Sequence, residues 1–75
     1  MFANKLRDEL LHLRFEGRSF DISLTDLDVG VMSSDREIKH ALAKYLGIGA
    51  AKLHAYLVDR HKNGNLTVRP EAVFG

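Results

Sequence analysis

The fold of this chain is decided by the stretch LLHLRFEGRSFDISLT, residues 10–25. Apolar and polar residues alternate along it, and the alternation breaks only around Gly17. The apolar row consists of Leu11, Leu13, Phe15, Phe20, Ile22 and Leu24. A period of two is typical of a strand with one face in the core and the other in water, and glycine suits the tight turn between two such strands. The sequence therefore predicts a β-hairpin here.

A helix is predicted to follow over residues 35–46. Ser34 and Glu37 have the spacing of a capping box, in which each side chain accepts a hydrogen bond from a backbone N–H group at the start of the helix. Asp35 adds negative charge at the positive end of the helix dipole. Apolar residues then recur every three or four positions, namely Ile38, Ala41, Leu42, Tyr45 and Leu46. Gly47 comes next and suits a left-handed C-cap, which predicts the end of the helix.

A short second helical turn is predicted over residues 50–56, where Leu53 and Tyr56 have helical spacing. Tyr56 and Tyr45 both occupy apolar positions of their predicted helices. We therefore expect both rings in the core, with their hydroxyl groups at its rim.

A second hairpin is predicted around the sequence KNGN, residues 62–65. A three-residue loop ending in Gly64 is favoured over a two-residue loop, because it places Val58 opposite Val68 with both side chains on the core face. Gly64 then occupies the loop position that needs a positive φ. Pro70 cannot donate a hydrogen bond to a neighbouring strand, so its strand should end there or lie at an edge of the sheet.

Composition indicates one small folded domain, residues 1–75, because the chain has 75 residues and a hydrophobic content of 45%. Its 11 basic and 10 acidic residues leave a net charge of +1, whereas dedicated nucleic-acid-binding domains tend to be far more basic. The lack of cysteine excludes disulfides, thiolate metal ligands and a cysteine nucleophile. Charged residues throughout positions 1–13 interrupt any signal peptide or membrane span, so we expect a cytoplasmic protein that does not enter a membrane.

The sequence contains no pattern that is typical of a catalytic or metal-binding site. The four histidines His12, His40, His54 and His61 lack the spacing of a helical metal-binding pair. There is no glycine-rich phosphate-binding loop, and Ser34 is already explained as a helix cap. We therefore expect no catalytic residues, no metal and no cofactor, and we do not expect an enzyme.

Two strands, a capped helix, a short helical turn and a second hairpin together resemble the β-grasp fold of ubiquitin-like proteins. The resemblance spans residues 10–73 and rests on the order and size of the elements. Its clearest points are the hairpin at 11–24 and the helix at 35–46, which ends in Leu-Gly-Ile. The resemblance implies an α+β fold of the ββαββ type, with a mixed sheet packed on the main helix, and a non-catalytic function in protein binding.

If the role of that family carries over, the exposed face of the sheet binds another protein, which the sequence does not identify. The candidate residues on this face are His12, Arg14, Asp21, Ser23, Arg60 and Arg69. A sheet of this kind also allows a homodimer to form through a free edge strand.

The C-terminal tail adds two candidate binding residues, Phe74 and Gly75. In the ubiquitin-like family, a terminal Gly-Gly is adenylated by an activating enzyme or thiocarboxylated in a sulfur carrier. Here a single glycine follows a bulky Phe74, which fits poorly in a narrow channel that accepts glycine backbone. A modifier or sulfur-carrier function through Gly75 therefore ranks below non-covalent binding, and we expect Phe74 to fold back over the core.

A second resemblance predicts a different function. The helix at 35–46 and the segment 50–57 also resemble a helix-turn-helix, and the hairpin at 58–69 could then be the wing of a winged helix. Candidate DNA contacts would be Lys52, His54, Arg60 and Lys62. Alanines at three positions of the second segment leave few side chains to reach base edges. DNA binding is therefore the alternative to protein binding.

Overall fold

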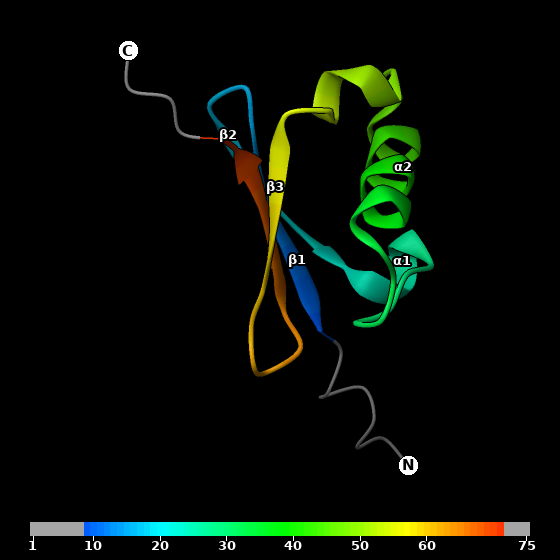
Figure 1. Ribbon diagram of the computed structural model, residues 1–75, viewed down its shortest axis with the longest axis vertical. Helices are drawn as coiled ribbons and strands as arrows, with labels where there is room; N and C mark the ends of the chain where they lie inside the picture. Colours follow the sequence, from blue (N-terminus) through cyan, green and yellow to red (C-terminus); the bar gives the residue numbers. More distant parts are fainter. Residues whose placement is uncertain (1–8, 72–75) are drawn as a thin grey trace.

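A computed structural model of the protein describes residues 9–71. Their elements, in chain order, are β1 (Leu10–Phe15), β2 (Arg18–Ser23), α1 (Leu24–Leu27), α2 (Asp35–Leu46), the 3₁₀ turn η2 (Ala50–Leu53), β3 (Tyr56–Arg60) and β4 (Leu66–Pro70). The four strands form one sheet in the order β2-β1-β4-β3 (Figure 1). The central pair β1 and β4 is parallel, and the two outer pairs are antiparallel. The predicted α+β fold, a mixed sheet with one main helix, is confirmed.

Both predicted hairpins form, and their turns are set by residues with positive φ. In the first hairpin, Glu16 and Gly17 have φ values of 52° and 78° and connect the paired residues Phe15 and Arg18. Two consecutive positive φ values match the right-handed twist of the strands on either side. In the second hairpin, Gly64 has a φ of +92°.

The register of the second hairpin is the predicted one. Val58 pairs with Val68 and Arg60 pairs with Leu66, as a three-residue loop requires. The strand β4 ends at Pro70, where the sequence predicts its end. This register puts Leu66 and Val68 on the core face, where both side chains are buried.

The helix α2 begins and ends at the predicted residues. The Ser34 side chain accepts a hydrogen bond from the Glu37 backbone, and the Glu37 side chain accepts one from the Ser34 backbone, so the capping box is complete. Gly47 is the C-cap and has a left-handed conformation, with a φ of 72°. The helix therefore has satisfied backbone groups at both ends.

The core lies between one face of the sheet and the helical elements. Its buried residues are Leu11, Leu13, Ile22, Leu24, Leu27, Ile38, Leu42, Ala43, Leu53, Leu66 and Val68. Tyr56 packs against this core, but the expectation that Tyr45 is buried is wrong, because 54% of its surface is exposed. The side of α2 that faces the core is centred near Leu42 and extends to Ala43, which leaves Tyr45 at its border.

Two helical segments differ from the prediction. The second helical turn ends at Leu53 rather than at residue 56, because Tyr56 pairs with Pro70 and already belongs to β3. The spacing of Leu53 and Tyr56 reflects two elements that contact the same core, not one helix. The sequence also gave no indication of α1, in which Ser23 is the N-cap and Asp28 the left-handed C-cap.

Candidate functional site

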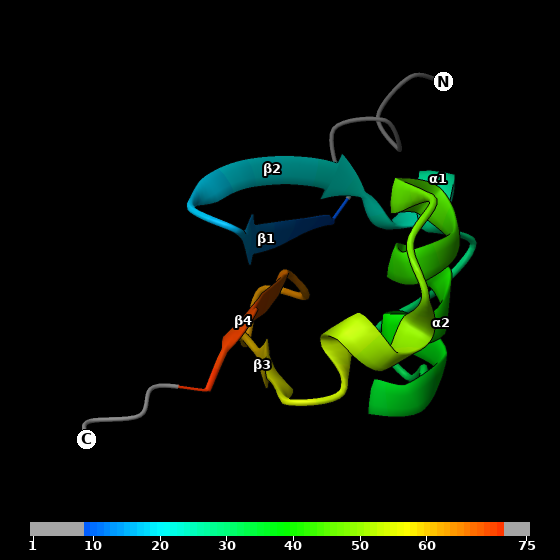
Figure 2. The same ribbon diagram turned by 90° about the horizontal axis from the view of Figure 1, so that it is seen from above.

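The two faces of the sheet have different surroundings. The elements α1, α2 and η2 all lie on one side of it (Figure 2). No helix within residues 9–71 covers the other side. We call this second side the outer face, and it consists of the alternating strand positions that point away from the helices, most of which are polar.

One row of residues crosses the outer face over all four strands. Asp21 on β2 pairs with His12 on β1, His12 pairs with Thr67 on β4, and Thr67 pairs with Asp59 on β3. His12 Nδ1 lies 2.7 Å from Asp21 Oδ1, and 48% of the His12 side chain and 63% of the Asp21 side chain are exposed. The row brings together residues that are up to 55 positions apart, from His12 to Thr67.

Two further contacts connect this row to its neighbours. Arg69 Nε donates a hydrogen bond to Asp59 Oδ2 over 2.9 Å, and this contact is also an ion pair. His61 Nε2 lies 2.8 Å from Thr67 Oγ1. Both aspartates of the outer face are therefore already bound to a basic side chain of the same face.

Arg14 differs from the other charged residues of the outer face. It follows Leu13, which pairs with Val68, so Arg14 and Arg69 extend from adjacent strands on the same side. Arg14 is exposed, and it has no ion pair with any residue in the range 9–71. Leu57, which pairs with Arg69, adds an apolar side chain that is 38% exposed. The outer face therefore presents an arginine that is open to an external carboxylate.

The structure places Arg60 on the opposite side of the sheet, so its predicted position on the exposed face is wrong. Arg60 pairs with Leu66, whose side chain is in the core, and paired residues share a face. Its guanidinium group donates hydrogen bonds to Val31 O over 3.0 Å, to Ser33 O over 2.8 Å and to Asp35 Oδ1 over 2.6 Å. Arg60 therefore holds the loop that precedes α2 against the end of β3.

Ser23 is at the end of the outer face and has a structural role. Its Oγ accepts a hydrogen bond from the Thr25 backbone over 3.2 Å, which caps α1. The structure thus brings together His12, Arg14, Asp21 and Arg69 among the predicted residues and adds Asp59, His61 and Thr67, which sequence reasoning missed. The alternating positions of the second hairpin contain the signal for these three residues. Phe74 and Gly75 lie outside the described residues.

Residues 35–57 do not form the helix-turn-helix that the DNA-binding alternative requires. Its second helix would need residues 50–57, but only the four residues of η2 are helical there, in 3₁₀ form. Lys52 and His54 precede β3 and Lys62 follows it, so they lie at opposite ends of that strand (Figure 1). Arg60 is bound to the loop before α2.

Within residues 9–71, no group of three or more histidine, aspartate or glutamate side chains is arranged to hold a metal ion. None of the helices in this range has the length and apolarity that a membrane span requires. Comparisons of the chain with models of protein families, with curated proteins and with solved structures gave no match.

Proposed function

We propose that this chain is a non-catalytic, ubiquitin-like protein-interaction domain, and that its outer face binds a carboxylate-bearing segment of another protein. The observation that carries this proposal is that the aspartates of that face already have basic partners, whereas one of its arginines has no acidic partner in the described part of the chain. Asp21 and Asp59 are engaged by His12 and Arg69, while Arg14 has no carboxylate partner among residues 9–71.

The chemistry of arginine supports a carboxylate as the group that is bound. The planar guanidinium group can donate two parallel hydrogen bonds to one carboxylate, which gives both strength and orientation. Arginine is also enriched among the residues that contribute most to protein–protein binding. Leu57, which pairs with Arg69 on the strand next to Arg14 and is 38% exposed, could contact an apolar side chain next to the bound carboxylate.

The same face suits a protein better than DNA. Two aspartates interleave with its basic residues, and they would lie close to phosphate groups in a DNA complex. The net charge of +1 also gives little of the long-range attraction on which non-specific DNA binding depends.

The proposal is tested by affinity capture followed by mapping of the bound surface. Proteins retained by the immobilised wild-type chain are identified by mass spectrometry and purified, and each is then titrated into the isotope-labelled chain. We expect amide shift changes at His12, Arg14, Thr67 and Arg69. We also expect Arg14→Glu to weaken binding at least about tenfold, which corresponds to about 1.4 kcal/mol.

The matched control is Lys52→Glu, which makes the same change of charge on the helical side of the sheet. It should leave binding of the partner unchanged. Shift changes confined to the helical side, or equal binding by Arg14→Glu and the wild type, would refute the proposal. A titration with duplex DNA is run on the same sample. Salt-sensitive shifts at Lys52, His54 and Lys62 would instead favour the DNA-binding alternative.

A further inference from the structure

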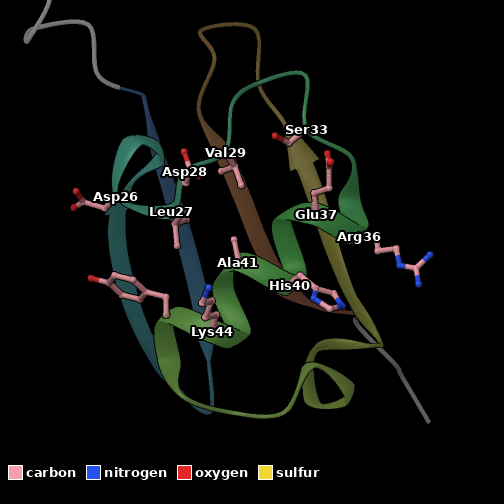
Figure 3. A pocket seen from close by; sticks show the side chains of 11 residues that line it. Asp26, Leu27, Asp28, Val29, Ser33, Arg36, Glu37, His40, Ala41 and Lys44 are labelled. Atoms are coloured by element: carbon pink, nitrogen blue, oxygen red, sulfur yellow. The ribbon is translucent and has the colours of Figure 1, made fainter.

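A second surface lies on the opposite side of the molecule from the outer face. It is an open groove between α1 and α2, with a volume of about 810 Å³ (Figure 3). Leu27, Val29 and Ala41 contribute apolar surface to its lining. Tyr45, with 54% of its surface exposed, also lines the groove. The groove therefore combines apolar surface with an accessible aromatic ring.

Charges of opposite sign are separated across this groove. Asp26 and Asp28 belong to the α1 side, whereas His40 and Lys44 extend from α2 (Figure 3). Arg36 precedes His40 by four positions, as His40 precedes Lys44, so the three basic residues follow one side of the helix. The α1 border of the groove is therefore acidic, and the α2 border is basic apart from Glu37.

The two borders do not neutralise each other. The ion pairs found among residues 9–71 are His12–Asp21, Arg60–Asp35 and Arg69–Asp59, and none of them crosses the groove. Glu37 also lines the groove, but its carboxylate accepts a hydrogen bond from the Ser34 backbone as part of the capping box. The charges of Asp26 and Lys44 therefore remain available to an external partner.

We infer that the partner on this groove is a second copy of the chain, in a two-fold symmetric dimer. In such a dimer the same patch meets itself, and when the two-fold axis runs along the groove, the acidic border of each copy faces the basic border of the other. A purely acidic or purely basic partner would match one border and be repelled by the other. The net charge of +1 adds little repulsion between copies, and Tyr45 supplies the aromatic surface that is common at interface centres.

This dimer leaves the outer face of both copies uncovered, because the groove lies on the helical side of the sheet (Figure 2). Two binding faces would then be joined in one particle. A partner with two carboxylate-bearing segments would bind such a particle with an avidity that exceeds the affinity of one face.

Charge reversal tests the inference. The variants are Asp26→Lys and Lys44→Glu, each studied alone and in an equimolar mixture by sedimentation velocity over a wide range of concentrations. The wild type should approach twice the monomer mass as its concentration rises. Each variant alone should dimerise at least about tenfold more weakly, because like charges then face each other. The mixture should recover the dimer, because both contacts between the two variants again join opposite charges.

Thermal unfolding of each variant shows whether it remains folded, and Arg14→Glu serves as a control that should dimerise like the wild type. Three outcomes would overturn the inference: a wild type that is monomeric at every concentration, single variants that dimerise normally, or a mixture that remains monomeric. A wild-type dimer that both variants preserve, with new amide protection along β2 or β3, would indicate pairing through a sheet edge instead.

Discussion

Leu10 and Leu11 are the same residue type at adjacent positions of one strand, yet their surroundings are opposite. Leu11 is 0% exposed and packs in the core, whereas Leu10 is 40% exposed on the outer face. The same contrast holds over most of the sheet, since one face packs apolar side chains in the core and the other carries hydrogen-bonded polar pairs. The comparison suggests that the helical side stabilises the fold and that the outer face is free to vary for binding.

The largest expected effect comes from truncating these two leucines. Leu11→Ala should lower the free energy of unfolding by about 2–5 kcal/mol, because it removes buried methyl groups and leaves a cavity. Leu10→Ala should cost less than about 1 kcal/mol, because its side chain is already partly in water. Urea unfolding followed by circular dichroism measures both. Similar losses for the two variants would contradict the assignment of the faces.

The next effect concerns Gly64, in the loop that sets the register between β3 and β4. A Cβ atom at Gly64 would lie 2.6 Å from Glu9 Cγ, and the φ of +92° is strained for any residue with a Cβ. Gly64→Ala should therefore destabilise the fold by about 1–2 kcal/mol. Gly30→Ala is the control, since an added Cβ there meets nothing within 4 Å. Equal unfolding midpoints for the two variants would show that the loop tolerates a side chain.

Two arginines on opposite faces give a third comparison. Arg60→Ala should cost about 1 kcal/mol, because it removes three hydrogen bonds that hold the loop before α2. Arg14→Ala should change stability by less than about 0.5 kcal/mol, as is usual for an exposed side chain without a partner. Hydrogen exchange of amides 31–35 should also increase in Arg60→Ala alone. An unchanged exchange rate in that variant would argue against the role of Arg60.

The smallest effect is expected from the ion pair between His12 and Asp21. Both side chains are largely exposed to solvent, so the pair should contribute no more than about 0.5 kcal/mol to stability. A double-mutant cycle with His12→Ala and Asp21→Ala isolates this coupling. A coupling well above 1 kcal/mol would mean that the outer face also stabilises the fold.

Sequence reasoning succeeded where neighbouring residues carry the signal. Alternation around Gly17 was enough for the first hairpin, and the capping box with Gly47 was enough for both ends of α2. Register in the second hairpin followed from the requirement that Val58 and Val68 share a face. These features depend on backbone geometry over a few residues, which the local sequence determines.

The candidate site was only partly predictable. Alternation placed His12, Arg14, Asp21 and Arg69 on one face, as observed. It did not reveal that His12 adjoins Thr67, because that contact depends on the parallel pairing of the first and last strands. Parallel pairing joins residues with a long segment of chain between them, so it leaves no local pattern.

The sequence by itself determined the elements, their turns and the alternation that separates an apolar face from a polar one. Only the tertiary structure decided that the first and last strands pair in parallel, that Tyr45 on α2 is turned away from the core, and that the Arg60 side chain binds the loop before α2. These features arise when distant elements compete for the same core surface, and packing then overrides local preference. The groove between α1 and α2 also depends on the tertiary structure, because its two borders come from separate elements that are brought together by folding.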